Sequence, residues 1–315
     1  MDMTRRSFLA GGAAFGGLVA SARLPAFADG PVLSSERGKS ERLTISCHHI
    51  EAGASKPFSV LHISDTHLTA VYPDENEWTR KFMANRSKTF GGRQEEALRD
   101  SLAWAKEHVD YVMHTGDLID AQSRANLDLV RKYYGIDGAT MGGSLGNHEF
   151  YHGQKDETEE GKVDSREILS KAYPFDISLS SSIVNGVNFV TIDNVYGAVT
   201  TEQASRFEAE VKKGLPIILC MHCPFNTPEI YRSALKLWRK HVLKINTPPN
   251  AKSWREGYRD PVTKDFVAYL KALPSLKGIL AGHLHISVQA RFSPNAMEYV
   301  VGGNYMFHGE EITFS

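Results

Sequence analysis

Short runs of apolar residues alternate with helical patterns along most of the chain. The run Phe58–Ile63 predicts a buried strand, and the apolar positions of Gln94–His108 recur at the spacing of a helix. Further strands are predicted at 110–115, 139–145, 188–193, 216–221 and 278–281, a closing antiparallel pair at 288–292 and 298–301, and further helices at 202–213 and 228–241. This alternation predicts an α/β fold in which helices cover the faces of the sheets.

The first 28 residues have the three-part pattern of a secretory signal peptide. Arg5 and Arg6 form a basic start, residues 8–20 form a short apolar run, and residues 26–28 form a small-x-small cleavage site. The run is shorter than the roughly 20 residues that span a bilayer. Residues 4–9 (TRRSFL) resemble the twin-arginine export signal. That resemblance implies the twin-arginine translocase as a partner and a periplasmic or extracellular location; an ordinary Sec signal or an uncleaved anchor is the alternative.

After this signal, we expect a flexible polar leader at 29–42 and one domain at 43–315. Two long stretches, 69–93 and 226–258, interrupt the alternation of strands and helices. Such insertions are either functional loops or simple caps of the domain, and the sequence does not decide between them. Three cysteines exclude a fully paired disulfide framework and leave open whether Cys220 and Cys223 pair.

Composition and charge remove several classes of protein. Hydrophobic residues make up 42% of the chain and charged residues 23%, which argues against a disordered chain and against a polytopic membrane protein. The formal net charge is −1. Because nucleic-acid binders usually carry a basic excess, we expect no stable nucleic-acid partner. We also expect no transmembrane segment in the mature form.

Five short polar motifs each follow a predicted strand. They are Asp65-Thr66-His67, Gly116-Asp117, Gly146-Asn147-His148-Glu149, His222, and Gly282-His283-Leu284-His285. In open α/β sheets, sites form at the carboxyl ends of the strands. Each motif is weak by itself, but the ordered set, with every member at the end of a strand, strongly indicates one site.

The side chains of these motifs favour a centre with two metal ions. Seven of them can ligate a metal: Asp65, His67, Asp117, Asn147, His222, His283 and His285. Four imidazoles suit Fe, Mn, Zn, Co or Ni better than Mg²⁺ or Ca²⁺, which prefer oxygen ligands. Seven ligands exceed what one tetrahedral ion needs, and with one bridging carboxylate they fit a pair of ions about 3.5–4 Å apart.

On these motifs the chain resembles the calcineurin-like metallophosphoesterase family over residues 60–285. The resemblance implies two packed mixed β-sheets, a β-sandwich flanked by α-helices, and two transition-metal ions, Fe, Mn or Zn. It places Asp65, His67 and His285 on the first ion, Asp117 as the bridge, and Asn147, His222 and His283 on the second. The implied reaction is hydrolysis of a phosphoric ester by in-line attack of a metal-bridging hydroxide.

Two further residues are candidates for catalysis. The resemblance places His148 over the scissile phosphate, where it can donate to the phosphate oxygens or protonate the leaving alkoxide. Asp120 follows Asp117 by three residues, where the phosphoprotein-phosphatase branch of the family carries a carboxylate, and this resemblance implies that Asp120 pairs with His148 and favours its charged form. The alternative for Asp120 is a solvated loop acid or a helix N-cap. One of the basic residues of the two insertions could contact phosphate, although such residues are usually solvated: Arg80, Lys81, Arg86, Lys88 and Arg255.

The subfamily motifs favour a phosphodiesterase. Asp120 stands where purple acid phosphatases have a metal-bound tyrosine, and Ala121 replaces the phosphate-binding arginine of phosphoprotein phosphatases. The motifs at 65–68 and 282–285 resemble class III cyclic-nucleotide phosphodiesterases. We therefore predict an exported phosphodiesterase acting on a small phosphate ester or an envelope phosphodiester. A phosphomonoesterase is the main alternative, and a catalytically silent metal-binding scaffold is a weaker one.

Overall fold

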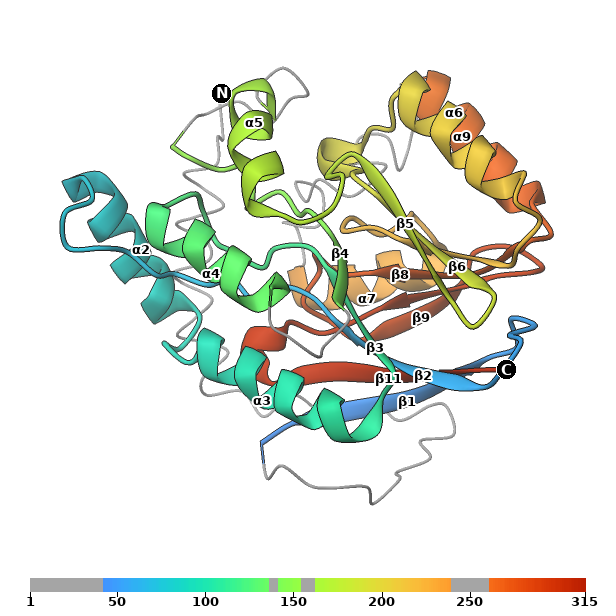
Figure 1. Cartoon of the computed structure of the whole chain (residues 1–315), viewed down its shortest axis with the longest axis horizontal. Coiled ribbons are helices and arrows are strands. Elements are labelled where there is room, and N and C mark those ends of the chain that lie inside the picture. Colours follow the sequence, from blue (N-terminus) through green and yellow to red (C-terminus); the bar gives the residue numbers. More distant parts are fainter. Residues whose placement is uncertain (1–41, 136–140, 154–161, 239–260) are drawn as a thin grey trace.

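The computed structural model describes residues 42–135, 141–153, 162–238 and 261–315. Two β-sheets pack against each other, and helices cover their outer faces (Figure 1). The predicted signal peptide and the leader up to residue 41 lie outside the described residues, as do the start of the strand predicted at 139–145 and the end of the helix predicted at 228–241.

The first sheet has five strands in the order β1-β11-β2-β3-β4. Their bounds are Thr44–Ile50 for β1, His308–Phe314 for β11, Phe58–Ile63 for β2, Tyr111–Thr115 for β3 and Met141–Ser144 for β4. Strands β2, β3 and β4 are mutually parallel, whereas β11 runs antiparallel to β2. The carboxyl ends of β2, β3 and β4 therefore lie at one edge of the sheet.

The second sheet has six strands in the order β5-β6-β7-β8-β10-β9. Their bounds are Leu179–Val184 for β5, Val187–Ile192 for β6, Ile217–Cys220 for β7, Leu276–Ala281 for β8, Met297–Val300 for β10 and Val288–Arg291 for β9. Strands β6, β7, β8 and β10 are parallel, and β9 and β10 form the predicted antiparallel pair.

The core has three parts because each sheet buries both of its faces. In β2, Val60 points into the cluster between the sheets, whereas Leu61 and Ile63 point to the outer cluster. That outer cluster packs under α3 (Gln94–His108), α4 (Arg124–Tyr134) and α5 (Val163–Ala172). A third cluster packs under α6 (Thr201–Val211), α7 (Pro228–Trp238) and α9 (Pro261–Ala272) on the second sheet. The predicted sandwich flanked by helices is confirmed.

Three strands, β1, β5 and β11, were not predicted. Strand β11 lies inside the first sheet although it contains Glu310 and Glu311, both buried. His62 and His48 lie 3.4 Å and 3.5 Å from the Glu310 carboxylate. Strand β11 therefore has paired polar residues at buried positions where a strand is usually recognised by apolar ones, and its sequence lacks that apolar pattern.

The fold settles whether two cysteines pair, and it shows what the first insertion contains. None of the three cysteines forms a disulfide, so Cys220 and Cys223 do not pair. The insertion at 69–93 is not a plain loop, because it contains helix α2 (Glu77–Thr89), which Asn76 caps through a hydrogen bond from Thr79 N to its side chain. Among the described helices, none combines the length and hydrophobicity needed to cross a membrane.

Candidate metal centre

The seven predicted ligands all lie just beyond the ends of β2, β3, β4, β7 and β8. Five of them have a left-handed backbone with φ between 54° and 70°: Asp65, His67, Asp117, His283 and His285. Non-glycine residues rarely adopt this conformation, and it concentrates at functional sites. Gly116 has a φ of 91°, and a Cβ atom there would lie 2.6 Å from Gly146 N and 2.7 Å from His222 Nδ1. The turn before Asp117 therefore requires glycine.

The first cluster consists of Asp65, His67 and His285. His285 Nε2 lies 3.2 Å from Asp65 Oδ1 and 3.0 Å from His67 Nε2. The N–H of His283 donates to Asp65 Oδ2 at 2.8 Å, which joins the loop after β8 to the loop after β2. The two sheets thus contribute ligands to the same cluster.

The second cluster consists of Asp117, His222 and His283. His222 Nε2 lies 3.3 Å from Asp117 Oδ2 and 3.1 Å from His283 Nδ1. The same Asp117 oxygen lies 3.7 Å from His67 Nε2 of the first cluster. Asp117 therefore stands between the two clusters, where a bridging carboxylate is expected.

Hydrogen bonds fix which nitrogen of two histidines carries the proton. His222 Nδ1 lies 2.8 Å from the Thr115 carbonyl, which can only accept, so Nδ1 is the donor and Nε2 faces Asp117. His67 Nδ1 likewise lies 2.9 Å from Asp120 Oδ1, so its Nε2 faces the first cluster. A second nitrogen directed at a carboxylate in this way requires either a proton or a metal ion.

The electrostatics of the clusters have the same consequence. Burial lowers the pKa of His67 to about 4, so this imidazole is neutral and can ligate a metal. Burial acts on His222 in the same direction, but Asp117 outweighs it and raises the pKa of His222 to about 10. A cation between Asp117 and His222 would balance the Asp117 charge in place of a proton on His222. Asp65 Oδ1 and Asn147 Oδ1 are buried without a hydrogen-bond partner, as ligands awaiting a cation would be. These residues fit metal ions.

Asp120 is buried and connects three side chains. Its Oδ1 lies 2.9 Å from His67 Nδ1 and 3.1 Å from His148 Nδ1, so the predicted contact with His148 is present. Arg86 donates to both oxygens, through Nε at 2.5 Å and Nη2 at 2.8 Å. Burial raises the pKa of Asp120, but Arg86 and His148 outweigh it and hold that pKa well below its usual range. The alternatives of a solvated acid or an N-cap are therefore wrong.

The cluster of His67, Asp120 and His148 could itself be mistaken for a metal site. However, the Arg86 guanidinium already neutralises the Asp120 carboxylate, and a cation there would be repelled. The cluster is instead a hydrogen-bonded support for the metal centre. Arg86, at 6% exposure, is therefore not solvated, whereas Arg80, Lys81 and Lys88 of the same insertion are exposed as expected.

His148 is held by its backbone and by its ring. Its N–H donates to Asp117 Oδ1 at 2.8 Å, and its Nδ1 lies 2.9 Å from the Asp120 carbonyl. Because a carbonyl only accepts, Nδ1 carries a proton, and Nε2 is the nitrogen left for other partners. Burial lowers the pKa of His148, but Asp117 and Asp120 outweigh it and raise that pKa above the ordinary value. The ring thus favours its charged form, as predicted.

Glu149 holds the loops on which Asp117 and His148 lie. Its buried carboxylate accepts hydrogen bonds from Asp117 N at 2.9 Å, Ile119 N at 3.2 Å and Gly146 N at 2.7 Å. Tyr173 donates its hydroxyl to the same carboxylate at 3.1 Å. The sequence analysis gave Glu149 no role, although it stands within the Gly-Asn-His-Glu motif.

We expect a Glu149→Ala variant to lose about 3 kcal/mol or more of unfolding free energy, because it leaves buried N–H groups without an acceptor. Urea unfolding of the metal-free protein measures this loss without contribution from bound ions. Glu107→Ala, at an exposed position of α3, is the matched control and should change stability by less than about 0.5 kcal/mol. A Glu149→Ala variant as stable as that control would show that the four hydrogen bonds contribute nothing.

Sequence reasoning also missed aromatic residues beside the first cluster. Phe90, the C-cap of α2, stacks on His67 with ring centroids 4.2 Å apart and planes 12° apart. Tyr305 follows β10, and its hydroxyl lies 3.3 Å from His285 Nδ1. Neither residue stands in a ligand motif, so no spacing pointed to it. Tyr151 is buried, and its ring centroid lies 5.2 Å from that of Phe82.

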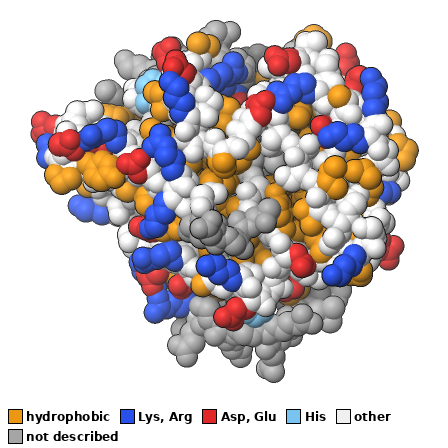
Figure 2. All heavy atoms as spheres, in the orientation of Figure 1, with side chains coloured by type: hydrophobic (Ala, Val, Ile, Leu, Met, Phe, Trp, Pro, Cys, Tyr) orange, Lys and Arg blue, Asp and Glu red, His pale blue; other side chains and the backbone are white. Residues whose placement is uncertain are grey.

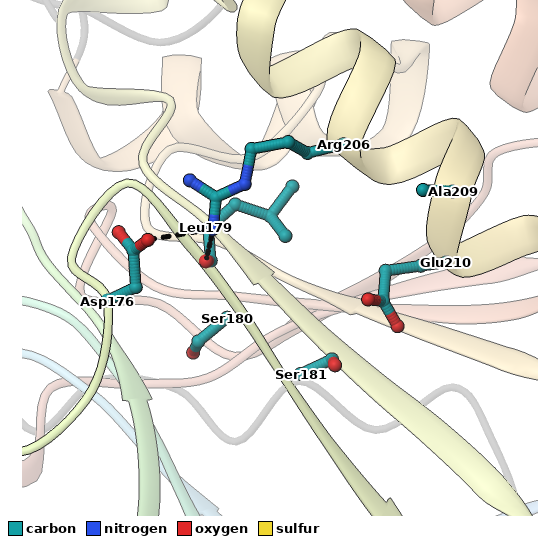
Figure 3. A pocket seen from close by; sticks show the side chains of 7 residues that line it. All are labelled: Asp176, Leu179, Ser180, Ser181, Arg206, Ala209 and Glu210. Atoms are coloured by element: carbon teal, nitrogen blue, oxygen red, sulfur yellow. Dashed lines mark hydrogen bonds and ion pairs between the residues drawn. The ribbon is translucent and has the colours of Figure 1, made fainter.

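A separate groove lies between β5 and α6, away from the ligands (Figure 3). Arg206 donates to Asp176 at 2.7 Å and to the Leu179 carbonyl at 2.6 Å. The groove contains none of the predicted site residues. Its charged groups largely satisfy one another, and it takes no part in the metal centre.

Comparison with solved structures finds similar chains at low sequence identity. A dimetal phosphatase from Danio rerio is 15% identical with a TM-score of 0.49, and the match covers 79% of this chain and 88% of that one. A putative 5'-nucleotidase from Staphylococcus aureus is 15% identical with a TM-score of 0.40, covering 79% and 49%. A purple acid phosphatase from yellow lupin is 15% identical with a TM-score of 0.44, covering 80% and 45%. This chain thus spans about half of the latter two structures.

No curated protein matches the sequence significantly. The sequence profile of the calcineurin-like phosphoesterases, in contrast, matches residues 58–287, which contain every predicted ligand. That match, the two packed sheets and the ligand sets for two metal ions agree, and the chain belongs to the calcineurin-like phosphoesterase family, whose members are hydrolases of phosphoric esters.

Proposed function

We propose that the chain is an exported phosphodiesterase with a two-metal centre. In this proposal Asp65, His67 and His285 bind the first ion, Asn147, His222 and His283 bind the second, and Asp117 bridges them. His148 acts on the leaving group, and Asp120 orients His148. The finding that carries the proposal is the position of Asp117 Oδ2, within 3.7 Å of His67 Nε2 and 3.3 Å of His222 Nε2.

The geometry of His148 supports its proposed role. Its Nδ1 proton is directed to the Asp120 carbonyl, so only Nε2 can deliver a proton to a leaving alkoxide. Asp117 and Asp120 favour the charged ring, which therefore holds that proton before the ester bond breaks. The two metal ions supply Lewis acidity toward the phosphate oxygens and a water of lowered pKa.

The pairing of buried cations favours diesters over monoesters. In the part of the chain that the structure describes, Arg86 and Lys162 are the buried arginine and lysine side chains. Arg86 is bound to Asp120, and Lys162 Nζ lies 3.0 Å from Asp193. A monoester near neutral pH carries more negative charge than a diester and gains more from an additional cation. Because carboxylates neutralise both Arg86 and Lys162, neither side chain is left to pair with the second negative charge of a monoester, which supports a diester as substrate.

Two substrates with the same leaving group test this preference. We expect kcat/KM for bis-p-nitrophenyl phosphate to exceed that for p-nitrophenyl phosphate by at least about tenfold, equivalent to ~1.4 kcal/mol. The protein is assayed after reconstitution with Mn²⁺, Fe²⁺, Zn²⁺ or Co²⁺, and an Asn147→Ala variant controls for contaminating activity. A preference for the monoester would replace the proposal by a phosphomonoesterase. Two bound metals without turnover of either ester would favour a metal-binding scaffold.

We further propose that the twin-arginine translocase exports the chain to the periplasm or the cell exterior. The pattern of residues 1–28 supports this proposal, and sequencing the amino terminus of the exported protein tests whether cleavage follows Ala28. On the face shown in Figure 2, the described Lys and Arg side chains are mixed with Asp and Glu and form no continuous basic track. This supports a small ester or an envelope phosphodiester as substrate rather than a nucleic acid.

A further inference from the structure

Helix α2 lies outside all five ligand motifs, and its carboxyl-terminal turn nevertheless contacts the metal centre. Arg86 and Phe90 are four residues apart, so they lie on the same face at the end of the helix. Both are buried, at 6% and 8% exposure, although the segment around them is polar. Phe90 N–H donates to the Arg86 carbonyl at 3.1 Å, which fixes the two residues relative to each other.

Arg86 determines the arrangement of the Asp120 carboxylate. Its two hydrogen bonds, at 2.5 Å and 2.8 Å, occupy both oxygens in the bidentate geometry that a planar guanidinium allows. Asp120 Oδ1 is thereby directed at His67 Nδ1 and His148 Nδ1. Without Arg86, a buried carboxylate would face only two imidazoles, and it could rotate away from either of them.

Phe90 acts on His67 from the ring face. Its ring stacks on the imidazole at 4.2 Å, and the Arg86 guanidinium lies 4.7 Å from the centre of the same Phe90 ring. The hydrogen bond to Asp120 fixes the tautomer of His67, and the stacking fixes the plane of its ring. Together these contacts determine where His67 Nε2 points.

We propose that Arg86 and Phe90 are positioning residues, which make helix α2 part of the metal centre. Arg86 orients His67 and His148 through Asp120, and Phe90 orients His67 by stacking on its ring. The inference rests on the proposed function for the role of His148, but not for the orientation of His67. In this arrangement Nε and Nη2 of Arg86 donate to Asp120 rather than to a substrate phosphate. Partners that orient a metal ligand typically change metal affinity or activity by 10- to 100-fold when they are lost.

The test compares Arg86→Met, Arg86→Lys and Phe90→Leu with Arg80→Met, which removes a similar charge from an exposed position of α2. Each metal-free protein is titrated with Co²⁺, and the visible absorption of the bound ion reports ligand geometry. Of the two Co²⁺ ions, we expect the one that binds more weakly to bind Arg86→Met about 10- to 100-fold less tightly than it binds the wild type. The visible absorption spectrum of the bound Co²⁺ should also change. Arg86→Lys should lose less, because lysine keeps the charge but not the two-pronged geometry. Arg80→Met should match the wild type.

Steady-state kinetics with bis-p-nitrophenyl phosphate at saturating metal form the second measurement. We expect kcat of Arg86→Met to fall about 10- to 100-fold while KM stays within about threefold. An increase in KM with unchanged Co²⁺ affinity would overturn the proposal in favour of direct phosphate binding. A lower Tm with unchanged Co²⁺ affinity, spectrum and kcat would overturn it in favour of a purely structural role. If the wild type binds Co²⁺ but cleaves no ester, the proposed function fails, and the affinities and spectra still decide the role of α2.

Discussion

An Asp117→Asn variant is expected to lose at least about 10³-fold in kcat/KM, equivalent to ~4 kcal/mol, and to retain less than two metal ions per chain. Asparagine has nearly the shape of aspartate and can still accept the 2.8 Å hydrogen bond from His148 N, so the fold of the loop should survive. What disappears is the negative charge between His67 and His222. A neutral amide cannot bridge two cations with comparable strength, because their mutual repulsion is no longer offset.

Metal analysis of the dialysed protein and kinetics with bis-p-nitrophenyl phosphate measure the two effects. Asp265→Asn is the matched control, since this aspartate is exposed on α9 and should leave both quantities unchanged. If Asp117→Asn kept two ions and activity within about tenfold of the wild type, Asp117 would not be the bridge. Loss of activity with retention of both ions would place Asp117 in orientation of His148 rather than in metal binding.

The ligand sets could be predicted because each ligand directly follows a strand. Alternating apolar runs located β2, β3, β7 and β8 almost to the residue, and parallel strands bring their carboxyl ends to one edge. Polar residues at such an edge have few roles other than a site. Strand ends alone predicted one common site, and the grouping of Asp65 with His285, across more than 200 intervening residues, came from the resemblance to the calcineurin-like family.

The supporting contacts could not be predicted, because they depend on tertiary packing. Arg86 and Phe90 belong to a helix of low hydrophobicity in an insertion, and only the folded chain shows that its last turn meets Asp120 and His67. Strand β11 was missed for a related reason, since a buried Glu310 is tolerated only beside His62 and His48. Periodicity detects apolar surfaces, and it does not detect polar residues that are buried because they are paired.

The left-handed conformations of Asp65, His67, Asp117, His283 and His285 are a further feature without a sequence signal. Each residue leaves its strand in a sharp turn that is unfavourable for side chains with a Cβ atom. Hydrogen bonds such as Asp65 N to the Gly116 carbonyl and His67 N to the Asp117 carbonyl, both at 2.9 Å, stabilise these turns. These backbone hydrogen bonds hold the loops that carry the ligands, and such pre-organisation favours metal affinity.

Replacing His148 by alanine is expected to lower kcat for a dialkyl phosphodiester by about 10²- to 10⁴-fold, the usual contribution of a general acid, while two metal ions remain bound. The ring is held by Asp120 and lies outside both ligand clusters that Asp117 connects, so its loss should not release an ion. Metal content is measured by elemental analysis, and His49→Ala, at an exposed position of β1, is the control.

The leaving group distinguishes a proton donor from a group that only neutralises phosphate oxygens. Nitrophenolate leaves readily without a proton, whereas an alkoxide does not. If His148 Nε2 protonates the leaving oxygen, His148→Ala should lower the hydrolysis rate least for an alkyl p-nitrophenyl diester, from which nitrophenolate leaves. The rate for a dialkyl diester should fall at least about tenfold more. Equal losses across leaving groups would assign His148 to stabilising the equatorial oxygens instead. In both cases the contact with Asp120 orients His148, because either role requires the Nδ1 proton to stay on the ring and Nε2 to face the substrate.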